Sequence, residues 1–223
     1  MVKKNVRKNN TKNCEIILNQ LAKEYPSAKS ELEFTNPLEC LIATMLSAQC
    51  TDQRVNMVTK NLFARYKRPE DYLNIDISQL EKLVKSCNYY KTKSKHIIEA
   101  CKILVEKHDG TVPDDRDALM ALPGVGRKTA NVVLSNAFGV PAIAVDTHVF
   151  RVSNRIGIIE AKDPMKAEEQ LMQVIKKNRW SDAHHWLILH GRRVCKARKP
   201  SCEKCIVSEW CIYYQKNNDG GAQ

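Results

Sequence analysis

Strong helix-start signals recur along the chain, and they constrain the fold more than any other feature of the sequence. Asn36, followed by Pro37 and Glu39, is typical of a helix N-terminus, because Asn can cap the first amides and Pro suits the first turn. Asp163 followed by Pro164 repeats the pattern. No pair of runs with alternating apolar and polar residues is joined by an Asn-Gly or Asp-Gly hairpin turn. The sequence therefore predicts an all-α fold.

The segment 142–159 is the stretch whose periodicity admits two interpretations. Its β-branched residues suit a strand, whereas Val145, Val149, Val152 and Ile156 also fit one face of a helix. Helices are predicted on both sides of this segment, and the sequence offers no partner strand. We therefore expect a helix here as well.

The net charge of +11, from 36 Lys and Arg against 25 Asp and Glu, favours a polyanionic partner, most simply nucleic acid. Hydrophobic residues make up 43% of the chain, which is ample for a buried core and excludes wholesale disorder. No run approaches roughly 18 consecutive apolar residues, so we expect no membrane-spanning helix. The basic N-terminal stretch is not followed by the apolar segment of a secretory signal. These features favour a cytoplasmic protein.

The segment Leu122–Lys128 is a predicted tight connection between two helices. Pro123 ends the first helix, and Gly124 and Gly126 allow a turn whose backbone amides are bare. Lys128 then falls in the first turn of the second helix, where free amides and the helix dipole suit a phosphate group. A connector without any ligand is the alternative, since two glycines around one apolar residue are a weak signal alone.

Four of the nine cysteines crowd into the segment 195–211 near the C-terminus. They are Cys195, Cys202, Cys205 and Cys211. Four thiolates suit either a [4Fe–4S] cluster or a tetrahedral zinc ion. Zinc sites usually pair two short CxxC-like turns, whereas only Cys202 and Cys205 are so spaced here and the outer gaps fit that pattern poorly. Most of the other five cysteines lie in apolar helical patterns and are expected to be small core residues.

Four stretches of the chain resemble the endonuclease III family of helix-hairpin-helix DNA glycosylases. They are the hairpin LPGVGRKTANVVL, the segment AVDTHVFRVSNR, the cysteine-rich stretch HHWLILHGRRVCKARKPSCEKC and the segment LSAQCTD. Together they span most of residues 35–213. The resemblance implies a two-domain all-α helix-hairpin-helix glycosylase fold with a C-terminal iron–sulfur cluster loop.

The resemblance also implies where the two domains divide. A six-helix domain would cover residues 30–140 and carry the helix-hairpin-helix motif at about 114–138. Residues 1–29 and 141–223 would form the second helical domain, and its cluster loop would be the cysteine segment defined above.

An enzyme of this family removes oxidised pyrimidines from duplex DNA and then cleaves the abasic site. An amine can attack the sugar C1′, displace the base and leave a Schiff base, which makes the 2′ hydrogen acidic so that β-elimination breaks the strand. The motif assigns this amine to Lys128. Asp146 matches the family's Asp that helps to generate the nucleophile and stabilises positive charge at the sugar. On local sequence alone, Asp146 is the N-cap of a helix.

The remaining matches concern the cluster and the DNA contacts. The cysteine spacing resembles the family's loop and implies a [4Fe–4S] cluster. Gln49 matches the residue that fills the gap left by an extruded base, and Tyr89 stands where relatives usually carry an aliphatic wedge. Ordinary packing is the alternative for Tyr89, and a structural hydrogen bond is the alternative for His148. Residues 85–95 hold four Lys and no acid, which favours a loop facing the DNA backbone. The other expected DNA contacts are Gly124, Gly126, Arg127, His148, Lys196, Arg198 and Lys199.

Two rival functions remain open from the sequence. One is a monofunctional, mismatch-specific glycosylase, although adenine-specific relatives usually lack Lys at position 128. The other is a non-enzymatic DNA-binding or redox-sensing module, against which the pair of Lys128 and Asp146 argues. The expected partner is double-stranded DNA that contains damaged bases or abasic sites, bound by a monomer in the nucleoid.

Overall fold

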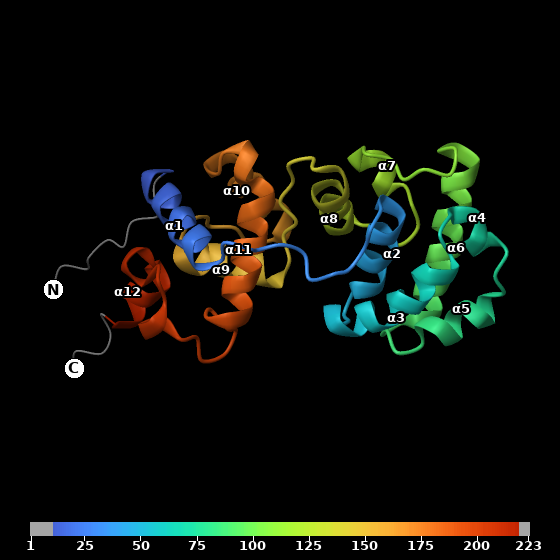
Figure 1. Ribbon diagram of the computed structural model, residues 1–223. Coiled ribbons are helices and arrows are strands. Elements are labelled where there is room, and N and C mark those ends of the chain that lie inside the picture. The colour runs from blue at the N-terminus through green and yellow to red at the C-terminus, as the bar shows by residue number, and fades with distance from the viewer. Residues whose placement is uncertain (1–10, 219–223) are drawn as a thin grey trace. The chain divides into compact units, whose positions relative to one another are not determined.

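The computed structural model describes residues 11–218, and every regular element in this range is helical (Figure 1). The expectation for the first ten residues, that they form no secretory signal, lies outside the described range. The chain forms two compact units, Ser30–Val140 and Met1–Lys29 together with Pro141–Gln223. The second unit is therefore discontinuous in sequence.

The continuous unit is built around one nearly buried helix. This helix, α2, packs against α6 and α8, and every residue from Leu38 to Leu46 is buried. The short helix α4 is an addition to the six helices expected from the sequence. The seven helices are α2 (Pro37–Ser47), α3 (Asp52–Arg65), α4 (Pro69–Leu73), α5 (Ile77–Val84), α6 (Tyr90–Lys107), α7 (Arg116–Met120) and α8 (Arg127–Phe138).

The discontinuous unit is organised by α11, which packs against both α1 and α9. Lys176 holds α1 from the other end of the chain, since its Nζ donates to Glu15 Oε1 over 2.6 Å. The described helices of this unit are α1 (Thr11–Glu24), α9 (Thr147–Ile156), α10 (Pro164–Val174), α11 (Trp180–Arg193) and α12 (Ile212–Asn218). Three short 3-10 turns complete it: η1 (Lys177–Arg179), η2 (Cys202–Lys204) and η3 (Ser208–Trp210).

Several helix starts were predicted correctly because their caps are local. The side chains of Asn36 and Asp163 accept the backbone N–H three residues on, that of Glu39 and that of Lys166, and each precedes a Pro at the first helical position. Thr51 caps α3 in the same way. Of the ambiguous segment 142–159, the helical part is confirmed as α9, whereas residues 141–146 form neither helix nor strand.

The segment Ser78-Gln79-Leu80-Glu81 has the pattern of a capping box and predicts a helix start at Ser78, and Thr92 predicts another. Both predicted starts are wrong. Helix α5 is capped by Asp76, whose side chain accepts the N–H of Ser78, so Ser78 itself lies inside the helix. Helix α6 begins at Tyr90 rather than at Thr92, because Tyr89 adopts the left-handed conformation and ends the preceding loop. A left-handed Tyr is rare, and no local pattern announces it.

Each unit has its own apolar core. The continuous unit buries Leu41, Leu46 and Leu104 among others, and the discontinuous unit buries Ile17, Leu21 and residues of α9 and α11. Between residues 11 and 218, the structure contains no helix with the length and apolar character needed to cross a membrane.

Candidate functional site

The predicted hairpin connects α7 to α8, and it is held by the apolar residues on either side of Gly124. Leu122 and Val125 are buried, and the N–H of Val125 donates to the carbonyl of Leu122 at 3.1 Å. Gly124 has a φ of +77°, and a Cβ atom there would lie 2.8 Å from His96 Nδ1. Both the backbone conformation and the close approach of α6 therefore require glycine at this position.

Gly126 is open on the side where a side chain would project. It is the N-cap of α8, and a Cβ atom added to it would meet nothing within 4 Å. Gly126 has no side chain with which to cap the first turn of α8, so that turn lacks the usual acceptor at its N-cap position. Lys128 lies in this turn with an exposed side chain, and Arg127 beside it is half-buried. A helix N-terminus without a side-chain cap at its N-cap residue, with Lys128 exposed in its first turn, suits the binding of a phosphate.

Asp146 is the N-cap of α9, as its local sequence predicts. Its Oδ1 accepts the backbone N–H groups of His148 and Val149, both at 2.8 Å. Both cap bonds end on Oδ1, so the helix cap does not use Oδ2. Asp146 belongs to the discontinuous unit and Lys128 to the continuous one. Their pairing remains a prediction.

The side chain of His148 makes structural contacts within the protein, which is the alternative to a DNA-binding role. Its ring lies against Gly191, where a Cβ atom would come within 2.9 Å of the His148 side chain. Its Nδ1 lies 3.1 Å from a terminal nitrogen of Arg151, and because a guanidinium only donates, Nδ1 accepts this bond. Arg151 also donates to the carbonyls of Gly191 and Cys195. Arg151, which the sequence did not single out, therefore ties α9 to the start of the cluster loop.

The four cysteines predicted as ligands line one pocket. The space between them amounts to about 310 Å³, part of it open to solvent, and the remaining lining is largely apolar. Among the described residues, no three His, Cys, Asp or Glu side chains converge as a site for one metal ion. A zinc ion needs all its sulfur ligands at about 2.3 Å from a single point. The cysteine spacing, rather than the shape of this pocket, favours a multi-atom cluster over zinc.

Burial favours the protonated form of three of these thiols. Burial raises the pKa of Cys205 to about 11, and burial also raises the pKa values of Cys202 and Cys211. Iron binding therefore has to displace protons, as expected for thiolate ligands. His190 Nε2 lies 3.4 Å from Cys205 Sγ, and Tyr25 Oη lies 3.1 Å from His190 Nδ1. The buried pair of Tyr25 and His190 could not be predicted from the sequence, because the two residues are 165 positions apart.

Arg155 of α9 orders the segment between the first two cysteines. Its guanidinium donates to the carbonyls of Lys196 and Ala197 at 2.7 and 2.9 Å, and it stacks 4.6 Å from the centre of the Tyr213 ring. The three cations predicted to meet phosphates are exposed on this loop: Lys196, Arg198 and Lys199.

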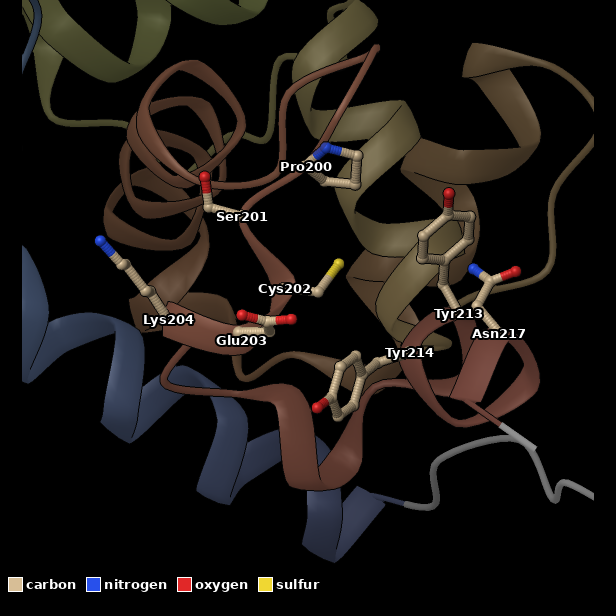
Figure 2. A pocket seen from close by; sticks show the side chains of 8 residues that line it. All are labelled: Pro200, Ser201, Cys202, Glu203, Lys204, Tyr213, Tyr214 and Asn217. Atoms are coloured by element: carbon tan, nitrogen blue, oxygen red, sulfur yellow. The ribbon is translucent and has the colours of Figure 1, made fainter. Parts of the chain in front are cut away.

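A second, open pocket adjoins the cluster loop (Figure 2). Cys202 lines both pockets and is the cysteine that faces the open one, where the rings of Tyr213 and Tyr214 stand beside it. Glu203 and Lys204 lie on the opposite side. Of the four cysteines, Cys202 is the one that lines this open pocket.

The two residues expected to enter the DNA lie at the tips of neighbouring loops in the continuous unit. Gln49 follows α2 and is exposed, and Tyr89 precedes α6 with 66% of its surface exposed. Packing between helices is therefore ruled out for Tyr89. Lys93, grouped with the lysines of a DNA-facing loop, is instead only 7% exposed. Its Nζ donates to the carbonyls of Leu46 and Ala48, both at 2.7 Å.

Comparison with known proteins covers nearly the whole chain. Residues 42–177 match the HhH-GPD superfamily of base excision DNA repair proteins, and residues 195–211 match the iron–sulfur binding domain of endonuclease III. Endonuclease III of Bacillus subtilis strain 168 is 50% identical over 95% of this chain and 97% of its own. Endonuclease III of Escherichia coli K12 is 48% identical over 93% and 98%.

Solved structures give the same result. A trapped endonuclease III–DNA covalent intermediate superposes with a TM-score of 0.90 at 47% identity, covering 94% of this chain and 99% of that one. A thermostable thymine-DNA glycosylase superposes with a TM-score of 0.83 at 26% identity, covering 92% and 98%.

Proposed function

Because the chain belongs to the endonuclease III family of HhH-GPD base-excision DNA repair proteins, we propose that it excises oxidised pyrimidines from duplex DNA and cleaves the resulting abasic strand through Lys128. The chain is a DNA glycosylase and abasic-site lyase. The observation that supports the proposal most is the exposed Lys128 in the first turn of α8, whose N-cap is Gly126.

Lys128 acts as the nucleophile in its neutral form. Its Nζ bonds to C1′ of the damaged nucleotide, the bond from C1′ to the base breaks, and the base leaves with a proton. Opening of the sugar gives an imine between Nζ and C1′, which acidifies the 2′ hydrogen. Removal of that hydrogen expels the 3′ phosphate, so the strand is cut without an oxidant or reductant. Water finally releases Lys128 from the imine.

Asp146 assists this sequence through Oδ2, the oxygen that the helix cap does not use. This oxygen accepts a proton from the Lys128 ammonium, which gives the neutral amine that attacks, and it then faces the positive charge that develops at C1′. Its other oxygen remains on the N–H groups of His148 and Val149, which fixes the carboxylate at the start of α9. The cap and the catalytic role are therefore compatible.

The protein carries a [4Fe–4S] cluster. We assign its ligands to Cys195, Cys202, Cys205 and Cys211, whose spacing favours a multi-atom cluster over zinc. When bound, the cluster cross-links the ends of the cationic loop. Arg155 and Arg151 hold the carbonyls of the same loop, so its exposed cations are presented to phosphates in a fixed arrangement.

Borohydride trapping on duplex DNA with one abasic site tests the proposed function. The wild-type protein is expected to form a covalent adduct, and Lys128→Gln is expected to form none while its DNA affinity changes less than about threefold. Lys102→Gln is the matched control, because Lys102 is an exposed lysine paired with Glu106. A monofunctional glycosylase excises the base without trapping, and a DNA-binding module does neither. An adduct that persists in Lys128→Gln refutes the assignment.

We further propose that one copy of the chain engages one lesion within the nucleoid. The net charge of +11 supports persistent association with DNA. Sedimentation of the protein with a short abasic duplex checks this: a one-to-one complex is expected, and two copies per duplex would contradict it.

A further inference from the structure

The two loops that carry Gln49 and Tyr89 are bonded to each other directly. Asn88 Nδ2 donates to the backbone carbonyl of Gln49 at 2.6 Å. Lys93, one turn into α6, donates to the carbonyls of Leu46 and Ala48. Three hydrogen bonds thus join the end of α2 to the start of α6, on both sides of the predicted DNA-entering tips.

Lys93 occupies a position that a helix C-terminus normally leaves to water or to a glycine cap. The last carbonyls of α2 have no partner within the helix, and the C-terminal end of the helix dipole favours a cation. Burial of Lys93 lowers its pKa, so the ammonium is held here against the cost of desolvation. A buried Lys that donates its hydrogen bonds to backbone carbonyls is well suited to fixing the position of those carbonyls.

Both tips are held in an unfavourable backbone conformation. Gln49 has a φ of +53° and Tyr89 a φ of +58°, a region that non-glycine residues rarely adopt. Such conformations persist when the surrounding contacts determine them. The contacts from Asn88 and Lys93 end on Gln49 and on the residue before it, Ala48. Beneath them Cys87 is buried and Cys50 packs against the same core, so the two loops also share their apolar base.

We infer that Lys93 and Asn88 are positioning residues that hold Gln49 and Tyr89 as a single preformed wedge for entry into the DNA duplex. The inference rests on the proposed function, because it explains how a base-excising enzyme would enter the DNA duplex. An extruded nucleotide leaves a gap in one strand and an unpaired base in the other. Two tips at a fixed separation fill both positions at once, whereas two independent loops would each have to be ordered on the DNA.

The test compares excision from an intact duplex with cleavage at an abasic site, where no base has to be unstacked. Lys93→Met keeps the aliphatic stem and removes the donors. We expect its single-turnover excision of an oxidised pyrimidine to fall about 10–30-fold, and abasic-site cleavage to change less than about threefold. Lys93→Arg, which can still donate to two carbonyls, should recover most of the loss. Lys102→Met, an exposed position on the same helix, is the matched control.

A double-mutant cycle separates positioning from simple stability. If Lys93 acts by positioning Tyr89, adding Lys93→Met to a Tyr89→Ala variant should lower the excision rate by less than about threefold. The same loss in both backgrounds, or parallel losses of excision and abasic cleavage with a lowered melting temperature, overturns the inference. If Lys93→Met does not fold, Asn88→Ala replaces it in the cycle, because Asn88 is exposed. Its expected loss of excision is about 3–5-fold on the same reasoning, and an unchanged rate overturns the inference.

The proposed function and this inference fail in different ways. Absence of borohydride trapping by the wild-type protein refutes the proposed function, and the inference falls with it. A wild type that traps and excises, together with an equally active Lys93→Met variant, refutes the inference alone.

Discussion

Replacement of each hairpin glycine by Ala should affect a different property of the protein: its stability at Gly124 and its DNA affinity at Gly126. Gly124→Ala would force a left-handed Ala, which costs about 1–2 kcal/mol. Its new Cβ would also lie 2.8 Å, 2.9 Å and 3.1 Å from three atoms of His96. Overpacking of this kind costs about 1–3 kcal/mol. We therefore expect Gly124→Ala to destabilise the protein by about 2–5 kcal/mol and to lower its melting temperature by about 5 °C or more.

Gly126→Ala should leave stability nearly unchanged. Its backbone φ is −90°, which Ala adopts freely, and a Cβ atom there meets nothing within 4 Å. The reduced freedom of the unfolded chain favours Ala by about 0.4–1 kcal/mol, and the poorer capping by Ala offsets a similar amount. The methyl group nevertheless projects where a phosphate is expected to approach the amides of α8. DNA affinity should therefore fall by about tenfold.

Thermal unfolding and fluorescence anisotropy with an abasic-site duplex measure both effects. His96→Ala provides the internal check, because it removes two of the three close atoms and should reduce the cost of Gly124→Ala. An equal cost in both backgrounds would show that the steric argument is wrong. Wild-type DNA affinity in a stably folded Gly126→Ala variant would refute the placement of a phosphate at this turn.

Three further predictions concern the discontinuous unit. Asp146→Asn should reduce turnover by about 100-fold or more with an unchanged melting temperature, because Asn caps helices as well as Asp does; turnover within threefold of wild type would make Asp146 a cap alone. Cys202→Ser should lower the iron content of the protein and speed proteolysis of the cluster loop, while α8 keeps its hydrogen-exchange protection. Full iron content in this variant would show that Cys202 is not a ligand. Burial lowers the pKa of His185 below its ordinary value, so the unfolded chain binds the proton more readily and stability should fall as pH drops from about 6.5 through the folded pKa; His185→Gln should flatten that part of the stability curve, and an unchanged slope would show that other groups cause it.

Features with local causes were accessible from the sequence. Asn36 and Thr51 cap their helices through amides three residues away, so a short window contains the whole interaction. The cysteine spacing likewise predicted ligands that line one pocket. The hairpin glycines were identified by their turn chemistry, although the close approach of His96 to Gly124 could not be predicted.

Features that depend on distant partners were not accessible. Lys93 looked like one more surface cation, and only the carbonyls at the end of α2 explain its burial. Arg151 and His190 act through residues about 40 and 165 positions away, as their contacts with Gly191 and Tyr25 show. Such interactions are set by tertiary packing, which neither propensity nor periodicity records.

The split of one unit between the two chain ends imposes an order on folding during synthesis. Helix α1 is made first, yet its partner α11 follows only after the whole of Ser30–Val140 has been translated. Tyr25 and His190 are 165 residues apart, which corresponds to roughly 10–30 seconds of translation. During that time Ile17 and Leu21 of α1 lack the core that later covers them completely, whereas the hairpin-bearing unit is fully translated before α11 appears. The nascent chain therefore exposes a short amphipathic helix to chaperones until α11 leaves the ribosome.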